Sequence, residues 1–135
     1  MTAGETNLRN LLGSMKPLLN DGVFVFVTMP ANDPLPSGVD PIMSFRETEG
    51  RTLIITEQEA TTLGLPARFH CRMVTLQIHS SLKAVGFLAA ITTRLAAAGM
   101  GVNPVSAFYH DHLFLAVHHI DEAMRLLKEL AVENS

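Results

Sequence analysis

The feature that most constrains this sequence is the order of secondary structure predicted for its second half. An alternating strand pattern is followed by an apolar helical pattern, two short apolar runs that form a hairpin, and an amphipathic helix. These elements occupy residues 69–79, 82–98, 102–109, 113–117 and 120–130. The order strand, helix, strand, strand, helix lacks one strand of a ferredoxin-like unit.

The missing strand has to come from another part of the chain. Residues 131–135, which follow the last helix, are mostly polar and would make a poor central strand. We expect the strand from the N-terminal half, where Val23–Val27 is a continuous run of β-favouring residues. The sequence therefore predicts an α+β fold made of two interdependent halves, residues 1–68 and 69–135.

The N-terminal half has its own series of elements. Apolar residues at helical spacing over 8–19 predict a first helix, which Pro17 should bend or end early. Four prolines mark residues 30–41 as a loop, and two short strands follow it. Thr56 and Glu59 then form a capping box that opens a short helix. This half cannot close a sheet alone either.

Composition limits the partners of this chain. Charged residues make up 17% of the sequence, below the roughly 25% usual for soluble domains, so we expect a second copy to cover part of the surface. The net charge of −3 without a basic cluster argues against nucleic acid. No apolar run reaches the roughly 20 residues of a membrane span. No signal peptide is visible, and the single Cys71 cannot form an internal disulfide, so we expect a cytoplasmic protein.

The junction between the first strand and the first helix of the second half has the residues of a small-ligand site. It reads His79-Ser80-Ser81-Leu82. With Ser81 as the N-cap, the backbone N–H groups at the start of the helix can attract a carboxylate or a phosphate. Asn103, at the start of the next strand, offers one donor and one acceptor beside them.

A hairpin turn is predicted at His110-Asp111-His112, and it allows three interpretations. Asp111 can bond its own backbone within a polar turn, or it can accept a hydrogen bond from a ligand ammonium. Together with His118 and His119, the turn also holds five potential metal ligands. Between the two functional interpretations, the ammonium acceptor fits better, and we predict no metal site and no catalytic residue.

The order of elements and three motifs resemble the ACT domain superfamily, and more narrowly the small stand-alone tandem-ACT proteins. The motifs are His79-Ser80-Ser81-Leu82-x-x-Val85-Gly86, Ala98-Gly99 followed by Asn103, and Tyr109-His110-Asp111-His112-Leu113-Phe114. The resemblance covers about residues 20–130. It implies tandem βαββαβ units, each with helices on one face of an antiparallel sheet.

The resemblance also implies a function. ACT regulatory domains commonly bind an amino acid between the first strand–helix loop of one unit and a neighbouring unit. The corresponding residues of this sequence are His79, Ser80, Ser81, Leu82, Gly86, Val102 and Asn103. We expect this chain to depart from the family pattern in having no attached enzyme domain to regulate. Its first half also lacks the loop motif, so we expect one effector site per chain.

We therefore predict a non-enzymatic, cofactor-free homodimer that senses a small amino acid or a related metabolite. One alternative is a structural module that only oligomerises or docks on an enzyme. A metal-dependent enzyme built on the histidine cluster is the other alternative.

Overall fold

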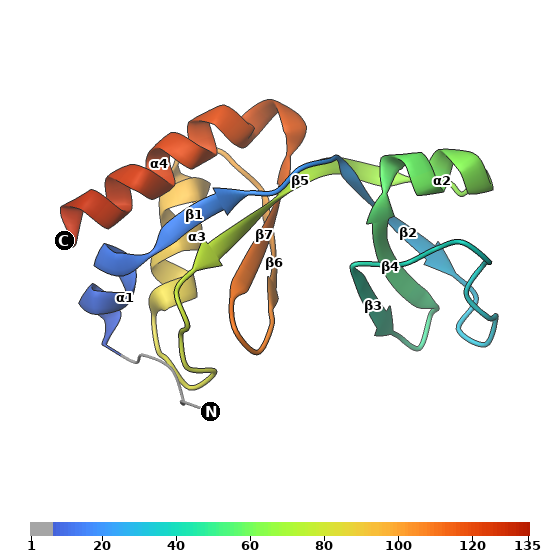
Figure 1. Cartoon of the computed structure of the whole chain (residues 1–135), viewed down its shortest axis with the longest axis horizontal. Helices are drawn as coiled ribbons and strands as arrows, with labels where there is room; N and C mark the ends of the chain where they lie inside the picture. The colour runs from blue at the N-terminus through green and yellow to red at the C-terminus, as the bar shows by residue number, and fades with distance from the viewer. Residues whose placement is uncertain (1–6) are drawn as a thin grey trace. The chain divides into compact units, whose positions relative to one another are not determined.

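The computed structural model describes residues 7–135, and the chain divides into two compact units (Figure 1). One of them, the terminal unit, combines the chain up to Asp21 with Arg72–Ser135. The other, the inserted unit, is Gly22–Cys71. The predicted halves, 1–68 and 69–135, differ from these units in the N-terminal segment, which packs with residues of the second half.

The terminal unit has the strand order of a ferredoxin-like fold. Its elements are α1 (Leu8–Ser14), β1 (Lys16–Leu19), the later part of β5 (Arg68–Gln77), α3 (Phe87–Ala97), β6 (Val102–Ser106), β7 (Asp111–Ala116), the 3-10 helix η1 (Val117–His119) and α4 (Ile120–Glu133). The strands lie in the order β1-β5-β7-β6, and the pairs β1–β5 and β6–β7 are antiparallel. The strand that closes the unit thus comes from the N-terminal segment.

Strand β1 is the element that the second half lacks. Its Leu19 lies opposite Val74 of β5. A strand from the N-terminal half was expected here, but the choice of Val23–Val27 is wrong, because that run belongs to the inserted unit. Pro17 explains why the helix predicted over 8–19 stops after α1, since proline disrupts a helix interior but is tolerated in an edge strand.

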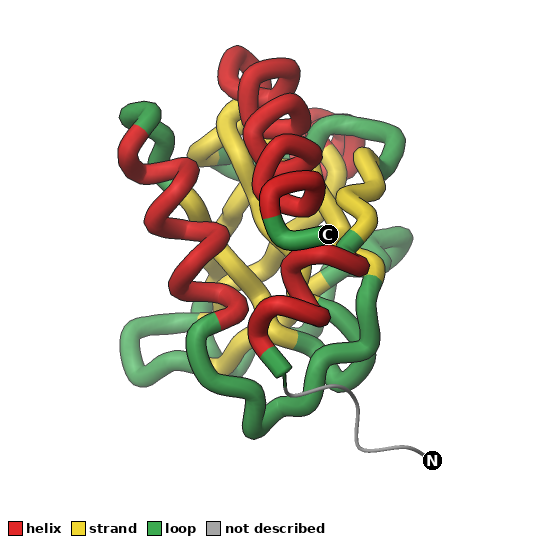
Figure 2. Tube along the Cα trace, turned by 90° about the vertical axis from the view of Figure 1, so that its left-hand side faces the viewer, coloured by secondary structure: helices red, strands yellow, loops and turns green. Residues whose placement is uncertain are grey.

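Three helices cover one face of the sheet of the terminal unit (Figure 2). Alternate residues of β5 and β7 point to this face, because successive side chains of a strand point to opposite faces. The buried core consists mainly of Leu11, Leu12, Val74, Leu76, Phe87, Ile91, Leu95, Leu113, Leu115, Ala123, Leu127 and Leu130. Each large apolar side chain buried here contributes about 1.5–3 kcal/mol of transfer free energy.

The inserted unit repeats this strand order with a single helix. Its elements are β2 (Phe24–Met29), β3 (Met43–Arg46), β4 (Arg51–Thr56), α2 (Glu57–Leu63) and the first residues of β5. The order β3-β4-β2-β5 corresponds to β6-β7-β5-β1 of the terminal unit. Between its first two strands, where the terminal unit has α3, the inserted unit has the proline-rich loop 30–42. Its core is Val25, Val27, Leu53, Ile55 and Ala60.

The fold is therefore α+β, with two ferredoxin-like units in tandem, as predicted. The predicted strands of the second half correspond to β5, β6 and β7, and its last helix to α4. Within residues 7–135, every helix is too short or too polar to cross a membrane.

Candidate functional site

The loop between β5 and α3, residues 78–86, contains a local turn. The Ser81 hydroxyl accepts a hydrogen bond from the backbone N–H of Lys83 at 3.1 Å, and the Ser81 carbonyl accepts one from Ala84 at 2.9 Å. Ser81 therefore caps a turn inside the loop. The prediction that it caps a helix over 82–98 is wrong.

Helix α3 begins at Phe87, later than its sequence pattern suggests. Leu82 and Val85 are 67% and 85% exposed, so they do not belong to the apolar stripe that faces the core. Gly86 precedes the helix with a φ of +93°, a left-handed conformation that glycine adopts at little cost. Within residues 7–135 no side chain caps this helix, so no side-chain oxygen of the described residues occupies the N–H groups of its first turn. Such groups bind anions readily.

The hairpin turn lies earlier in the chain than expected. The backbone N–H of Ala107 donates a hydrogen bond to the carbonyl of His110 at 3.0 Å, which closes the turn. Asp111 and His112 already belong to β7, so the prediction of a turn at His110–His112 is wrong. The shift also decides the face of the sheet on which each of these side chains lies.

Asp111 is a nearly buried carboxylate, with 9% of its surface exposed. It lies opposite Ser106 of β6, whose hydroxyl donates a hydrogen bond to Oδ1 of Asp111. Asp111 shares its side of β7 with Leu113 and Leu115, which face the helices. The interpretation in which Asp111 bonds its own backbone is therefore wrong. The sequence pattern missed Ser106, whose role depends on the register of the hairpin.

The turn and the β5–α3 loop meet at a cluster of rings. The His79 ring centroid lies 6.1 Å from that of Phe108 and 5.5 Å from that of Tyr109. Nδ1 of His110 lies 3.3 Å from the carbonyl oxygen of Ile78, so the start of β7 is tied to the end of β5. Phe108 and Tyr109 are about half exposed, and neither was expected at the site.

Val102 and Asn103 lie apart from this cluster. Val102, the first residue of β6, packs against the core of the terminal unit. Asn103 is exposed and pairs with Phe114, so it lies on the sheet face opposite to that of Asp111. It also lies near the start of β6, whereas Ser106, the partner of Asp111, ends that strand. The structure therefore does not bring Asn103 and Asp111 together.

The histidines do not converge on a metal site. Nδ1 of His112 hydrogen-bonds to Oγ1 of Thr75 at 2.9 Å, and this hydroxyl also accepts from the Asn20 amide at 2.9 Å. Burial lowers the pKa of His112, and the positive charge of His110 lowers it further, while Asp111 opposes the shift. In the part of the chain that the structure describes, no three His, Cys, Asp or Glu side chains are placed to hold a metal ion.

Cys71 does not have the environment of a reactive thiol. It is fully buried, and its Sγ donates a hydrogen bond to the carbonyl of Phe24 at 3.3 Å. Burial raises the pKa of the thiol to about 12. The thiolate, which is the nucleophilic form, is therefore scarce at neutral pH.

Comparison with known families agrees with this geometry. Residues 3–72 match one model described as ACT domain, and residues 68–129 match a second model with the same description. This chain belongs to the ACT domain family. No curated protein matches the ACT chain.

Solved structures with the same fold cover most of the ACT chain. A protein of unknown function from Vibrio cholerae, described as a possible transport protein, is 37% identical over 92% of this chain and 95% of its own, with a TM-score of 0.81. A protein from Agrobacterium tumefaciens is 16% identical over 87% of this chain and 89% of its own, with a TM-score of 0.74. The regulatory subunit of aspartate kinase from Thermus flavus is 10% identical over 84% of this chain and 95% of its own, with a TM-score of 0.61.

Proposed function

We propose that this ACT protein is a regulatory sensor and not a catalyst. Its ligand would be a small amino acid bound where β5 ends and α3 begins. The observation that carries the proposal is the nearly buried Asp111 carboxylate on the helix face at that end of the sheet. Among the described residues this carboxylate has one hydrogen bond, from the neutral Ser106 hydroxyl, and such a carboxylate is a strong acceptor for a ligand ammonium.

The start of α3 supplies the complementary chemistry. Its first-turn N–H groups have no side-chain cap among the described residues, and the positive end of the helix dipole favours an anion there. A free amino acid carries an ammonium for Asp111 and a carboxylate for these N–H groups. His79, Ser80, Ser81, Leu82 and Gly86 form the loop that would enclose the ligand, as the family resemblance implies.

Regulation would follow from linkage between ligand binding and assembly. A ligand that binds an assembled form more tightly shifts the population towards it. Leu82, Val85 and Phe108 are exposed apolar side chains in the loop and the adjoining turn, and a second copy would cover them. Val102 and Asn103 would contribute only if the second copy completes the site. We place this homodimer in the cytoplasm, consistent with the buried, unpaired Cys71.

The same exposed side chains favour a second candidate function. Without a ligand, this surface would serve only to join copies of the chain or to dock it on an enzyme. The two functions differ in one observable property, which is whether a free amino acid stabilises the protein.

A thermal-shift screen against the twenty amino acids tests the proposal. A ligand at about 100 times its Kd adds about 2.7 kcal/mol, or several degrees for a domain of this size. We expect a selective shift that Asp111→Asn abolishes, because asparagine keeps an acceptor for Ser106 but loses the charge. Asp33→Asn removes the same charge from an exposed loop residue and should leave the shift intact. A screen without any selective shift would favour the interaction module.

A further inference from the structure

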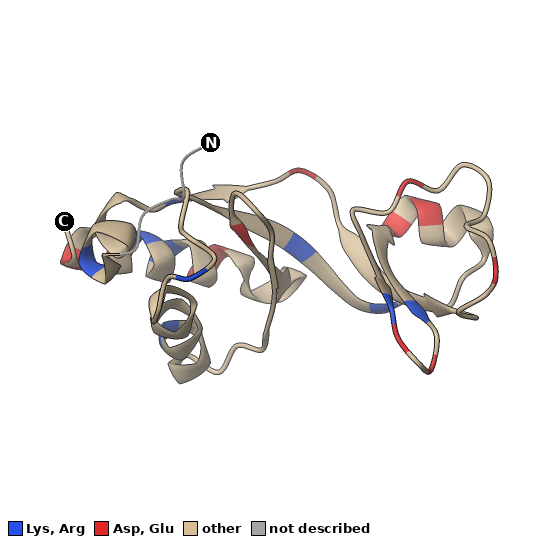
Figure 3. Ribbon diagram, turned by 90° about the horizontal axis from the view of Figure 1, so that it is seen from below, with Lys and Arg blue, Asp and Glu red and all other residues tan. Residues whose placement is uncertain are grey.

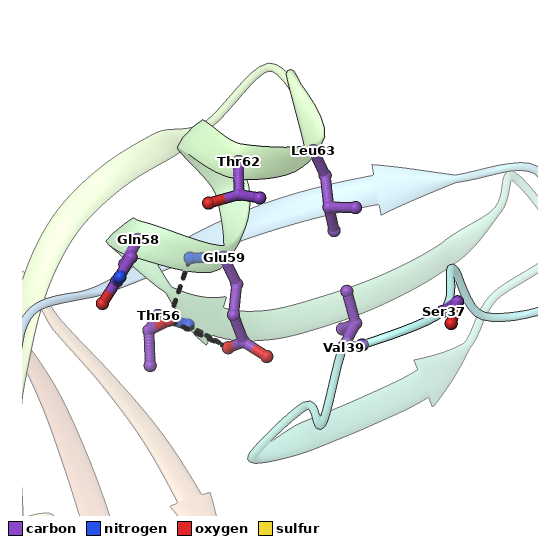
Figure 4. Close-up of a pocket in the computed structure, with 8 residues that line it drawn as sticks. Ser37, Val39, Thr56, Gln58, Glu59, Thr62 and Leu63 are labelled. Atoms are coloured by element: carbon purple, nitrogen blue, oxygen red, sulfur yellow. Dashed lines mark hydrogen bonds between the residues drawn. The ribbon is translucent and has the colours of Figure 1, made fainter.

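The inserted unit contains a pocket of about 240 Å³ between the proline-rich loop and α2 (Figure 4). This pocket, the α2 pocket, lies where the terminal unit carries its additional helix in the order of elements. Val39 and Leu63 point into it from opposite sides, and the Glu59 carboxylate lies beside them. The volume is slightly below the roughly 300 Å³ at which pockets for drug-sized ligands begin, so the ligand must be small.

The proline-rich loop, which forms one wall of the α2 pocket, is held in a defined conformation. The N–H of Val39 donates to the carbonyl of Pro36 at 3.3 Å, and Gly38 in this turn has a φ of +84°. Glycine at this position allows the turn, because other residues are strained at such a φ. Val39 also packs against the core of the inserted unit. The apolar wall is therefore held in place from two sides.

The opposite wall carries a fixed negative charge. Oε1 of Glu59 accepts hydrogen bonds from the N–H and the hydroxyl of Thr56, at 2.8 and 3.0 Å. Oε2 accepts one from the N–H of Asp40 at 2.9 Å, which joins the loop to the helix. Burial raises the pKa of Glu59, but these hydrogen bonds outweigh it, and the pKa lies below its usual value. Glu59 is therefore ionised at neutral pH.

Oε2 of Glu59 has an unused acceptor site. A carboxylate oxygen accepts about two hydrogen bonds, and Oε2 makes one with the described residues. The hydroxyls of Ser37 and Thr62 lie on the rim and form no hydrogen bond within residues 7–135. They can act as donors or acceptors for the far end of a ligand.

The charge around the α2 pocket excludes anions. No Lys or Arg occurs in α2 or in the loop 30–42, and among the described residues Glu59 is the one charged side chain that lines the pocket. In Figure 3 the charged residues on the helix of the inserted unit are all acidic (red), whereas the Lys and Arg residues of that unit (blue) lie on its strands. An anion would meet an ionised carboxylate without a compensating cation.

We propose that the α2 pocket binds a small aliphatic amine as its ammonium. The ammonium would donate to Oε2 of Glu59, and the hydrocarbon chain would lie between Val39 and Leu63. The site is independent of the proposed amino-acid site, because all its residues belong to the inserted unit. It would make the chain responsive to a second class of small molecule.

The first test is an NMR titration of the full ¹⁵N-labelled chain with n-butylammonium chloride at constant ionic strength. We expect saturable shifts of the backbone amides of Val39, Thr62 and Leu63. Butyrate should cause none, and n-butanol should bind more weakly, because neither carries a positive charge. Shifts that follow no saturation curve, or equal binding of n-butanol, would overturn the proposal.

A pair of matched variants tests whether the charge of Glu59 itself binds butylammonium. Glu59→Gln keeps the capping box, which accepts Glu or Gln, but loses both the charge and the acceptor for the Asp40 N–H, and it should weaken butylammonium binding about tenfold or more. Glu57→Gln removes the same charge two residues earlier in α2 and outside the α2 pocket, so binding should change less than about twofold. An equal loss of butylammonium affinity in both variants would indicate nonspecific electrostatic attraction and contradict the proposal.

A second variant tests the α2 pocket without changing Glu59, in case Glu59→Gln disturbs the fold. Thr62 is an exposed residue of α2 that lines the pocket rim. Thr62→Leu places a larger, apolar side chain at the rim and leaves residue 59 a glutamate, so it should abolish binding by blocking the α2 pocket while the spectrum remains that of a folded protein. Unchanged binding in this variant would also contradict the proposal.

Discussion

The Ser106 hydroxyl donates a hydrogen bond to the Asp111 carboxylate, and the two residues lie directly opposite each other on β6 and β7. Ser106 is exposed, whereas Asp111 is 9% exposed. The hydroxyl thus compensates part of the cost of keeping a carboxylate on the helix face of the sheet.

Ser106→Ala should lower the free energy of unfolding by about 1–2 kcal/mol, because Asp111 loses its donor and water replaces it only partly. Urea unfolding measures this loss. Ser44→Ala is the matched control, since Ser44 is an exposed residue of the edge strand β3 and should change stability by less than about 0.5 kcal/mol. Equal effects of both substitutions would show that the Ser106–Asp111 bond contributes nothing.

How much of this site could be predicted depended on the register of the strands. Turn residues predicted the hairpin, but a shift of one residue moves a side chain to the other face of a sheet. Because the turn was expected at His110–His112, Asp111 was placed in the turn, and its pairing with Ser106 across the hairpin could not be predicted. Asn103 was placed beside the ligand without knowledge of its face.

The fold shows the same limit on a larger scale. The need for an extra strand followed from the order of local elements, and this inference was correct. Its source could not be decided locally, because 8–19 fits a helical pattern and Val23–Val27 is the stronger strand former. The choice depends on a pairing between β1 and β5, more than fifty residues apart in sequence. Only Pro17 gave a local indication.

Gly86→Ala should destabilise the protein by about 1–2 kcal/mol, because a φ of +93° is unfavourable for residues with a Cβ. The nearest atom to an added Cβ, Cδ2 of Leu8, would lie at 3.4 Å, so the cost comes from the backbone and not from a clash. Gly101→Ala is the control, since Gly101 has open space and no positive φ. A lower melting temperature for Gly101→Ala than for Gly86→Ala would contradict this explanation.

The protein should lose stability as the pH falls below about 6.5, the usual pKa of histidine. The folded state lowers the pKa of His112, so the unfolded state binds more protons between the two pKa values. Stability from this residue is therefore present above the unfolded pKa and is lost as the pH falls towards the folded pKa. Burial is the main cause of this lowered pKa; among the charged neighbours, His110 adds to the lowering and Asp111 opposes it.

Urea unfolding between pH 7.5 and pH 5.5 would measure the His112 effect. His112→Gln keeps a hydrogen-bonding partner for Thr75 but cannot titrate, so its stability should depend less steeply on pH over this range. His118→Gln changes an exposed histidine and should retain the slope of the unsubstituted protein. The account of His112 fails if both variants keep that slope.

Thr56→Ala should destabilise the inserted unit by about 1–2 kcal/mol, because it removes the side-chain half of the α2 capping box. The Thr56 hydroxyl accepts from the N–H of Glu59 at 3.1 Å and donates to the Glu59 carboxylate at 3.0 Å. Glu59 also holds the N–H of Asp40, so the loosening should reach the proline-rich loop.

Hydrogen exchange resolves the Thr56→Ala effect residue by residue. The amides of Asp40 and of α2 should exchange faster, while those of α4 in the terminal unit should keep their protection. Thr61→Ala, on the exposed side of the same helix, should leave the Asp40 amide unchanged because its side chain makes no hydrogen bond within the described residues. If Asp40 keeps its protection in Thr56→Ala, Glu59 holds the loop without help from the cap, and the α2 pocket keeps its wall when the start of the helix frays.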